Sequence, residues 1–170
     1  SFCDGCVREI RLVEAPFCSI CAEPFTGLLT AEFRCPNCMG QDQPYRFAMA
    51  GGMSDGPLRE AIHNFKYRKR AALCVALARI MHRTIRQDER LREKDWLLVP
   101  VPLHSRRQQE RGFNQSEQLA RVLASLSRLP LCLALRRDRY TTAQATLERS
   151  ERQKNLKNAF SLTRVGRRRV

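Results

Sequence analysis

The chain has 170 residues, and its 31 Lys and Arg residues against 17 Asp and Glu give it a formal net charge of +14 at pH 7. Hydrophobic residues make up 43% of the chain, which is enough for a packed core and excludes general disorder. No apolar run approaches the roughly 18–20 residues of a membrane span. Arginine supplies 26 of the 31 basic residues, and its planar guanidinium suits phosphate or carboxylate. The charge fits a phosphate-bearing partner and a solvated basic surface equally well.

Three Cys-x-x-Cys pairs occupy the first 38 residues: Cys3/Cys6, Cys18/Cys21 and Cys35/Cys38. Two residues between thiolates let one tight turn aim both sulfurs at one ion, and two such turns complete a tetrahedron. The second and third pairs are 13 residues apart, near the spacing of a four-cysteine zinc site. We therefore predict structural zinc at Cys18, Cys21, Cys35 and Cys38. Disulfides would need an oxidising compartment; nothing indicates secretion, so we expect a cytoplasmic protein.

The remaining pair is Cys3 and Cys6. One tetrahedral zinc ion takes four ligands, so the six cysteines of the three pairs complete one site and leave two over. No histidine lies in the first 60 residues to complete a second site. Either the partner ligands precede Ser1 or the pair is free, and the missing initiator Met favours the first option. If Cys3 and Cys6 shared a zinc ion with Cys18 and Cys21, the pair Cys35/Cys38 would have no partner ligands. We therefore expect an incomplete second site at Cys3/Cys6, weak or empty of metal.

Two helices are predicted after the linker-like stretch 41–56. Ser54 or Asp55 can cap the first helix and Pro57 suits its first turn. Its apolar stripe consists of Leu58, Ile62 and Phe65. The second helix is predicted from about residue 71 to 93, with an apolar face of Leu73, Leu77, Ile80, Met81 and Ile85.

A continuous apolar run, 96–101, follows and is typical of a strand buried on both faces of a parallel sheet. The loop after it, 103–115, holds Arg106, Arg107, Arg111 and Gly112 just before a helix N-terminus. Free N–H groups and the helix dipole favour an anion there, and the glycine would let the backbone approach a phosphate closely. We predict that the three arginines form an anion site; a solvated basic loop is the alternative.

The remaining elements complete an α/β pattern. A helix capped near Asn114 or Ser116 is predicted to turn Leu119, Val122, Leu123 and Leu126 inward. The apolar run 129–135 is predicted as the next strand, and a polar stretch, 136–157, leads to a short strand at 159–163. Strand, loop, helix and strand in this order predict a parallel sheet, in which ligands bind beyond the carboxyl ends of the strands.

A series of motifs follows in a specific order along nearly the whole chain. The Cys-x-x-Cys repeats come first, then the segment 56–67, Val-Pro-Val-Pro-Leu at 99–103 and Arg-Gly-Phe-Asn-Gln at 111–115. Residues 141–147 and 151–160 match the pattern Thr-x-x-Gln…Arg-x-x-Asn…Ala-Phe. This order resembles the ComF family, the bacterial competence-protein-F-like homologues of phosphoribosyltransferases, which includes a protein associated with use of DNA as a nutrient.

The resemblance implies a zinc-binding module over residues 1–43 and a type I phosphoribosyltransferase-like α/β domain over residues 44–170. It implies phosphoribosyl pyrophosphate, with Mg²⁺, as the ligand. The pyrophosphate-binding loop would contain Arg106, Arg107, Arg111, Gly112, Asn114 and Gln115. A mobile hood segment would contain Gln144, Arg152 and Asn155.

One family motif is missing from these residues: two acidic residues followed by a Thr-Thr-Gly loop, which grips the ribose 5′-phosphate. It should begin just after Val170, so the chain resembles a family member truncated at both ends. We expect a complete protein to be enzymatic and this chain alone not to catalyse transfer.

Two functions stay open at this point. The first is a phosphoribosyltransferase-type protein serving DNA uptake or the use of DNA as a nutrient. The second is a zinc-ribbon competence factor that binds single-stranded DNA and keeps an inactive transferase fold; few exposed aromatics are expected for base stacking, which weakens it. The partners expected are phosphoribosyl pyrophosphate or another phosphate ligand, single-stranded DNA, and proteins of the DNA-uptake machinery.

Overall fold

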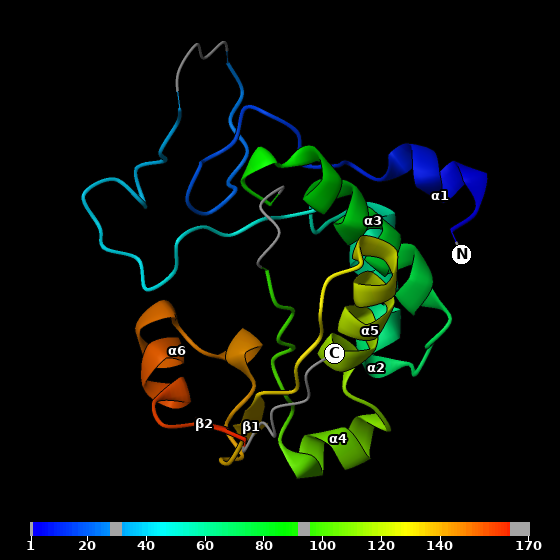
Figure 1. The fold of residues 1–170 in the computed structure, drawn as a ribbon, viewed down its shortest axis with the longest axis vertical. Helices are drawn as coiled ribbons and strands as arrows, with labels where there is room; N and C mark the ends of the chain where they lie inside the picture. The colour runs from blue at the N-terminus through cyan, green and yellow to red at the C-terminus, as the bar shows by residue number, and fades with distance from the viewer. Residues whose placement is uncertain (1, 28–31, 92–95, 164–170) are drawn as a thin grey trace.

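The computed structural model describes residues 2–27, 32–91 and 96–163. Figure 1 shows helices α2, α3 and α5 packed together, with two extended segments of the chain running beside them. The cysteine-bearing loops, drawn in blue to cyan, lie beyond one end of α3, and α4 lies near β1 and β2 at the other end of the molecule. The described part is therefore a mixed α/β fold with the cysteine loops and α4 far apart.

The main core forms between α2 (Gly56–Tyr67) and α3 (Leu73–Gln87). Its buried members are Leu58, Ala61, Phe65, Cys74 and Leu77, and Phe65 is 1% exposed. The predicted apolar stripes are therefore core contacts at Leu73, Leu77 and Ile80 as well as on α2, whereas Met81 is exposed and its prediction is wrong. The short helix α1 (Asp4–Glu9) packs against α2, and Phe2 and Ile10 on either side of it contact the same core.

Helix α5 (Gln115–Ser127) packs along α3, and the His82 Nδ1 on α3 lies 2.9 Å from the Ser127 hydroxyl at the end of α5. Of the two predicted caps, Asn114 and Ser116, the structure has Asn114: its side-chain oxygen accepts hydrogen bonds from the backbone N–H groups of Ser116 and Glu117. Leu123 is buried as expected, whereas Leu126 is exposed, so its inward prediction is wrong. Leu126 falls one turn beyond Val122, where the helix approaches its end.

Helix α3 ends at Gln87, earlier than the sequence predicts, and is followed by the 3₁₀ turn η1 (Glu89–Leu91). Asp88 adopts an extended backbone conformation, and its carboxylate accepts a hydrogen bond from the backbone N–H of Arg90. This local bond competes with continuation of the helix. The predicted end near residue 93 lies outside the described residues.

The segment predicted as an anion-binding loop contains a helix of its own, α4 (Ser105–Arg111). Gly112 ends it in the left-handed conformation, with φ of 82°, which is the conformation that favours glycine after a helix. His104 caps its start by accepting a hydrogen bond from the backbone N–H of Arg106. The three predicted arginines therefore lie on a helix and not on an open loop.

The two predicted strands meet at one isolated parallel bridge, and among the described residues the pairing does not extend into the predicted parallel sheet. Leu98 and Leu131 form a parallel bridge, in which Leu98 N–H donates to the Pro130 carbonyl and Cys132 N–H donates to the Leu98 carbonyl, both at 2.9 Å. The prediction that residues 96–101 are buried on both faces is wrong: Leu97 is 50% and Val101 54% exposed. Alternate side chains of an extended segment point to opposite faces, and only one face is packed here.

The remaining pairing is antiparallel, between β1 (Leu135–Arg137) and β2 (Phe160–Leu162), with Arg136 opposite Ser161. Between them lie the 3₁₀ turn η2 (Gln144–Thr146) and helix α6 (Arg149–Leu156), which begins with a capping box made by Glu148 and Glu151. β2 confirms the short strand predicted at 159–163. Within the described residues no helix is both long and apolar enough to cross a bilayer.

Candidate metal centre and anion-binding site

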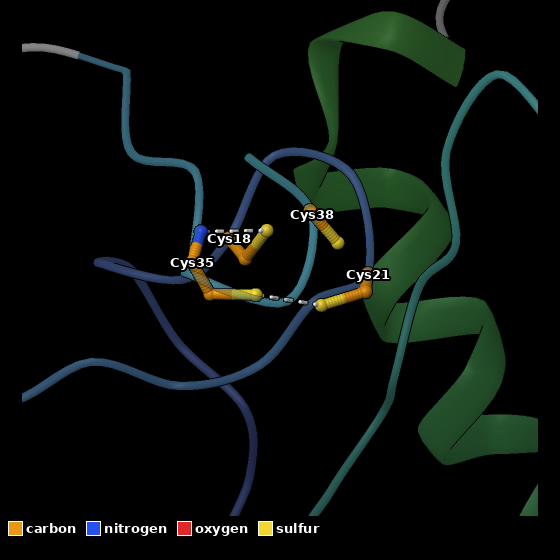
Figure 2. Close-up of side chains that lie close together, drawn as sticks. All are labelled: Cys18, Cys21, Cys35 and Cys38. Carbon is orange, nitrogen blue, oxygen red and sulfur yellow. Dashed lines mark hydrogen bonds between the residues drawn. The ribbon is translucent and has the colours of Figure 1, made fainter. Parts of the chain in front are cut away.

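The four predicted ligands come together in one cluster, the cysteine cluster of Cys18, Cys21, Cys35 and Cys38. Their sulfur atoms all lie within 4.8 Å of one another, and Figure 2 shows the side chains converging from two loops. Cys18, Cys35 and Cys38 are buried, and Cys21 is half-buried. The side chains of Ile20 and Phe33 pack against the cluster. The sequence prediction of which cysteines meet is therefore confirmed.

Each Cys-x-x-Cys pair closes a tight turn, as the spacing predicts. Ala22 N–H donates to the Cys18 carbonyl, and Cys38 N–H donates to the Cys35 carbonyl, both at 2.9 Å. Ala22 takes a positive φ of 61°, which turns the first loop back on itself. A hydrogen bond from Ser19 N–H to the Phe33 carbonyl, at 2.8 Å, holds the two loops against each other. These backbone hydrogen bonds bring the four sulfurs close together.

The geometry of the cluster fits a tetrahedral zinc ion. The Cys21 and Cys35 sulfurs are 3.6 Å apart, whereas sulfurs at about 2.3 Å from one zinc ion are separated by about 3.8 Å. All four thiols are free and none is in a disulfide. Four cysteine sulfurs with no open position are the donor set of a structural zinc site. The cluster can therefore hold one zinc ion.

The sulfurs are in unequal electrostatic surroundings. Burial raises the pKa of Cys18, but hydrogen bonds from backbone N–H groups, led by that of Cys35 at 3.3 Å, outweigh it and bring the pKa to about 6. Burial and the neighbouring sulfurs raise the pKa of Cys38 to about 12. Backbone N–H groups that point at a sulfur stabilise its thiolate form. Cys18 is therefore the sulfur best prepared to bind a cation.

Cys3 and Cys6 lie apart from the cysteine cluster, at the start of helix α1 and within it. Hydrogen bonds from the backbone and side chain of Cys6 lower the pKa of the exposed Cys3 thiol, and the bond from Cys3 raises the pKa of Cys6. The two sulfurs therefore face each other. Within the described part of the chain, no third or fourth metal-binding side chain joins them.

Arg90, which the sequence analysis did not single out, ties the cysteine cluster to the helices. Its guanidinium donates to the Asp88 carboxylate at 2.6 Å and to the Ser19 carbonyl, between Cys18 and Cys21, at 2.7 Å. It also lies 4.1 Å from the centre of the Phe47 ring. These bonds hold the pKa of Asp88 below its usual range. We call this contact the Arg90 clamp.

A cavity of about 780 Å³ lies beside the Arg90 clamp, between the cysteine-bearing loops and the end of α3. Acidic side chains contribute much of its polar lining, which includes Glu14, Glu32, Asp88 and Glu89. Phosphate would be repelled by these carboxylates. The predicted anion site is a different, open surface on α4.

The arginines of α4 divide between two tyrosines. The guanidiniums of Arg106 and Arg107 lie 4.9 and 5.3 Å from the ring centre of Tyr140. That of Arg111 lies 4.9 Å from the ring centre of Tyr67, at the end of α2. The three arginines therefore lie on one short helix but do not converge on one point.

A further arginine, Arg137 on β1, joins this surface. Burial lowers the pKa of its guanidinium, and the nearby positive charge of Arg107 lowers it further. Arg137 donates to the Thr141 hydroxyl, while its Nε is buried and has no hydrogen-bond partner among the described residues. We call Arg106, Arg107 and Arg111 together with Arg137 the arginine face. Two guanidiniums near each other with an unpaired N–H favour an anion between them.

The predicted contribution of the α5 N-terminus is altered by its own cap. The Asn114 side chain already accepts from the N–H groups that a phosphate would use. Gln115 has a buried side-chain oxygen without a partner in the described structure. Gly112 faces Lys69, whose Cε would lie 3.9 Å from an added Cβ. All three residues follow Arg111 within four positions of the chain, and their contact with an anion stays a prediction.

The hood residues make hydrogen bonds within their own segment. Gln144 donates to the Arg152 carbonyl at 3.5 Å, Arg152 Nε donates to the Leu147 carbonyl at 3.0 Å, and Asn155 donates to the Thr142 carbonyl at 3.0 Å. These bonds brace helix α6 against the turn before it. Figure 1 draws α6 and α4 on opposite sides of β1 and β2.

Tyr67, Tyr140, Arg137 and Arg90 were missed by the sequence analysis. For the tyrosines a signal exists, because each is next to basic residues: Lys66 and Arg68 flank Tyr67, and Arg139 precedes Tyr140. Arg90 and Arg137 each have a local partner, Asp88 and Thr141 respectively. Their contacts that matter here, with Ser19 and with the charge of Arg107, join distant segments and leave no local signal.

Comparison with curated proteins decides the family. The chain is 31% identical over 163 residues to competence protein F of Haemophilus influenzae. This alignment covers 94% of this chain and 69% of that protein. The chain belongs to the ComF family. It is also 32% identical over 167 residues to the DNA utilization protein YhgH of Escherichia coli K12, covering 94% of this chain and 70% of that protein. Competence protein ComFC of Bacillus subtilis is 25% identical over 135 residues, 76% of this chain and 54% of that protein.

These relatives confirm the resemblance drawn from the order of the motifs. No protein-family model matches the chain, and no solved structure matches it.

Proposed function

We propose that this ComF-family chain binds phosphoribosyl pyrophosphate at the arginine face, as part of a protein that serves DNA uptake or the use of DNA as a nutrient. The relatives named for competence and for DNA utilization support the biological role. The observation that carries the ligand is the Nε of Arg137, which is buried and has no hydrogen-bond partner among the described residues, on a guanidinium whose pKa is lowered by burial and by the charge of Arg107. Guanidiniums bind phosphate oxygens in paired hydrogen bonds.

The placement of the arginine face supports a type I phosphoribosyltransferase-like domain, to which residues 44–170 would belong. The parallel bridge between Leu98 and Leu131 supports this proposal, because the sheet of such a domain is built from parallel pairings. Arg107 lies just beyond the carboxyl end of the first extended segment, where ligands bind in parallel sheets. In this proposal Gly112, Asn114 and Gln115 border the pyrophosphate, and Gln144, Arg152 and Asn155 belong to the hood.

The metal requirements of the two regions differ. We propose one structural zinc ion in the cysteine cluster, within a module over residues 1–43. For Mg²⁺, the acidic side chain found at the arginine face is Glu110, which is paired with Arg106 and Arg107. Among the described residues, the cysteine cluster is the one set of three or more metal-binding side chains. Mg²⁺ would enter with the phosphates of the ligand. Transfer at ribose C1 is proposed for the complete protein only.

Calorimetric titration of the zinc-loaded chain with pyrophosphate and with phosphoribosyl pyrophosphate tests this proposal. Arg107→Ala should weaken both ligands by about tenfold or more, because charge-assisted hydrogen bonds contribute about 1.5–3 kcal/mol. Arg121→Ala is the matched control, since Arg121 is an exposed helix arginine paired with Glu117 away from this face. Equal affinities of the two variants would contradict the proposal.

A further inference from the structure

The cavity beside the Arg90 clamp is acidic, whereas the chain as a whole has a formal net charge of +14. Its lining holds four carboxylates, those of Glu14, Glu32, Asp88 and Glu89. One guanidinium, that of Arg90, accompanies them. Carboxylates gathered on the walls of a cavity focus a negative potential inside it. The cavity therefore attracts a cation, although the protein around it is basic.

The positive charge in the lining is already engaged, while part of the negative charge is open to a ligand. The Arg90 guanidinium donates to the Asp88 carboxylate and to the Ser19 carbonyl, at 2.6 and 2.7 Å. Glu14 accepts from Arg83, but this pair is exposed to solvent and contributes little. Across the part of the chain that the structure describes, no hydrogen bond or ion pair engages the exposed Glu32.

The wall of the cavity also contains an unsatisfied hydroxyl. Ser19 lies in the lining, and its Oγ is buried without a hydrogen-bond partner among the described residues. A buried polar atom without a partner costs free energy, which a ligand that bonds to it recovers. Apolar side chains complete the wall: Val13, Pro16, Phe17 and Phe33. The lining therefore suits a molecule that carries N–H groups on an apolar stem.

The carboxylates are spread over the cavity and do not converge on one centre. Among the residues that the structure describes, only the cysteine cluster forms a set of three or more side chains that could hold a metal ion. A divalent cation needs several oxygens at about 2.0–2.6 Å from one centre. The cavity volume of about 780 Å³ is that of a small-molecule site. The geometry therefore favours a larger cation with separated charges.

We propose that this cavity binds a small organic polycation, namely a polyamine whose ammonium groups are joined by short methylene stems. The ammonium groups pair with Glu14 and Glu32 and donate to the Ser19 hydroxyl, and the methylenes lie against the apolar wall. Because the lining comes from the cysteine-bearing loops and from the end of α3, one bound molecule bridges both. The site shares no residue with the arginine face, so this proposal and that of phosphoribosyl pyrophosphate binding can fail separately.

Calorimetric titration of the full zinc-loaded chain with spermidine, which carries three ammonium groups, tests this proposal. We expect one site per chain. Glu14→Gln and Glu32→Gln should each weaken binding by about three- to tenfold, the range from an exposed ion pair to a charge-assisted hydrogen bond. Glu60→Gln is the matched control, because Glu60 is exposed on α2 outside the cavity and its loss changes the net charge equally. It should leave the affinity unchanged.

Ser19→Ala separates contact with the ligand from a structural role. It should weaken spermidine binding by about two- to tenfold, because one hydrogen bond is lost. The chain without ligand should be no less stable, because the variant removes a hydroxyl that has no partner there. Urea unfolding with and without spermidine measures both effects. A loss of stability without spermidine would show that the hydroxyl has a structural role and would contradict its part in the site.

Trp96 provides a second readout, because it is the one tryptophan of the chain. Its ring meets that of Phe47 edge-on at 5.9 Å, and the Arg90 guanidinium lies 4.1 Å from the centre of the Phe47 ring. A ligand that contacts Arg90 in the cavity should therefore change the Trp96 emission in a saturable way. In Glu32→Gln the same change should need about three- to tenfold more spermidine.

Three further ligands identify the chemistry of the cation. The diamine 1,4-diaminobutane should bind more weakly than spermidine, because it has one ammonium group fewer. Mg²⁺ at equal concentration should not displace spermidine. A blocked trilysine peptide presents the same ammonium groups as a partner protein would, and it should bind more weakly than spermidine. The proposal is overturned if spermidine does not saturate, if Glu60→Gln acts like Glu32→Gln, if Mg²⁺ displaces spermidine, or if the peptide binds more tightly.

Discussion

The cysteine cluster and the arginine face are both built from short motifs, yet the sequence determines them to different degrees. In the cluster, the four predicted side chains meet within 4.8 Å because each pair closes its own tight turn. On the arginine face, the predicted residues spread along α4 and contact rings from α2 and from the segment after β1. Local turns thus place metal ligands reliably, whereas a binding surface depends on which distant segments pack beside it.

Metal removal should have the largest effect and should affect the two regions unequally. Structural zinc contributes about 10–16 kcal/mol in small zinc fingers, so a strong chelator should unfold the cysteine-bearing loops. The core of Phe65 and Leu77 does not include the cluster and should remain folded. Metal analysis should give one zinc ion per chain, and circular dichroism should show that the helices survive.

Cys3→Ser provides the control for metal removal. It should leave the zinc content at one ion per chain, because Cys3 and Cys6 have no further ligands among the described residues. Cys18→Ser should abolish zinc binding. A zinc content that falls equally in both variants would show that the pairs combine differently.

The next largest effect concerns the ranking of arginines on the arginine face. Arg107 lies near Arg137, while Arg111 contacts Tyr67 at the other end of α4. Pyrophosphate affinity should therefore fall by about tenfold or more in Arg107→Ala and by less in Arg111→Ala. Isothermal titration measures both. A larger loss of affinity in Arg111→Ala than in Arg107→Ala would place the anion site at the C-terminal end of α4.

The Arg90 clamp should contribute about 1–3 kcal/mol to stability, since it pairs charged groups by hydrogen bonds in a partly buried place. The pKa of Asp88 is lowered from the usual 3.8 by Arg90, so this contribution is present above that pH and is lost as pH falls through the lowered pKa. Asp88→Asn should therefore be less stable than the wild type at pH 7. Urea unfolding should show the difference shrinking below about pH 4.

A smaller effect is expected from the cap of α5. Asn114→Ala removes two hydrogen bonds to backbone N–H groups and should cost about 1 kcal/mol of stability. It also frees those N–H groups for an anion, so pyrophosphate affinity should not fall in proportion to the loss of stability. A large loss of affinity at unchanged stability would assign Asn114 a direct contact with the ligand.

The sequence predicts those features of the structure that depend on local contacts and misses those that depend on distant segments. The Cys-x-x-Cys spacing, the cap at Asn114 and the stripe ending at Phe65 depend on neighbours a few residues away, and all three are confirmed. The prediction that residues 96–101 are buried on both faces is wrong, because burial depends on what covers the second face of the extended segment. The Arg90 clamp joins residues 71 positions apart, which no local pattern reveals.

The candidate site shows the same limit. The arginines of α4 were found from their concentration in one segment, but the tyrosines beside them were not, although each has a basic neighbour in the sequence. Too few exposed aromatics were expected for base stacking, because a count of residue types does not reveal which of them share a surface. The structure places two of the three tyrosines against arginines.

The central claim is that the arginine face binds the phosphorylated ligand while the cysteine cluster has a structural role. The most direct test is a titration of the isotope-labelled, zinc-loaded chain with phosphoribosyl pyrophosphate, followed by amide chemical shifts. We expect saturable shifts at Arg107, Gly112 and Arg137 and none at the four cysteines. Absence of saturable shifts on the arginine face, or equal shifts at the cysteine cluster, would contradict the claim.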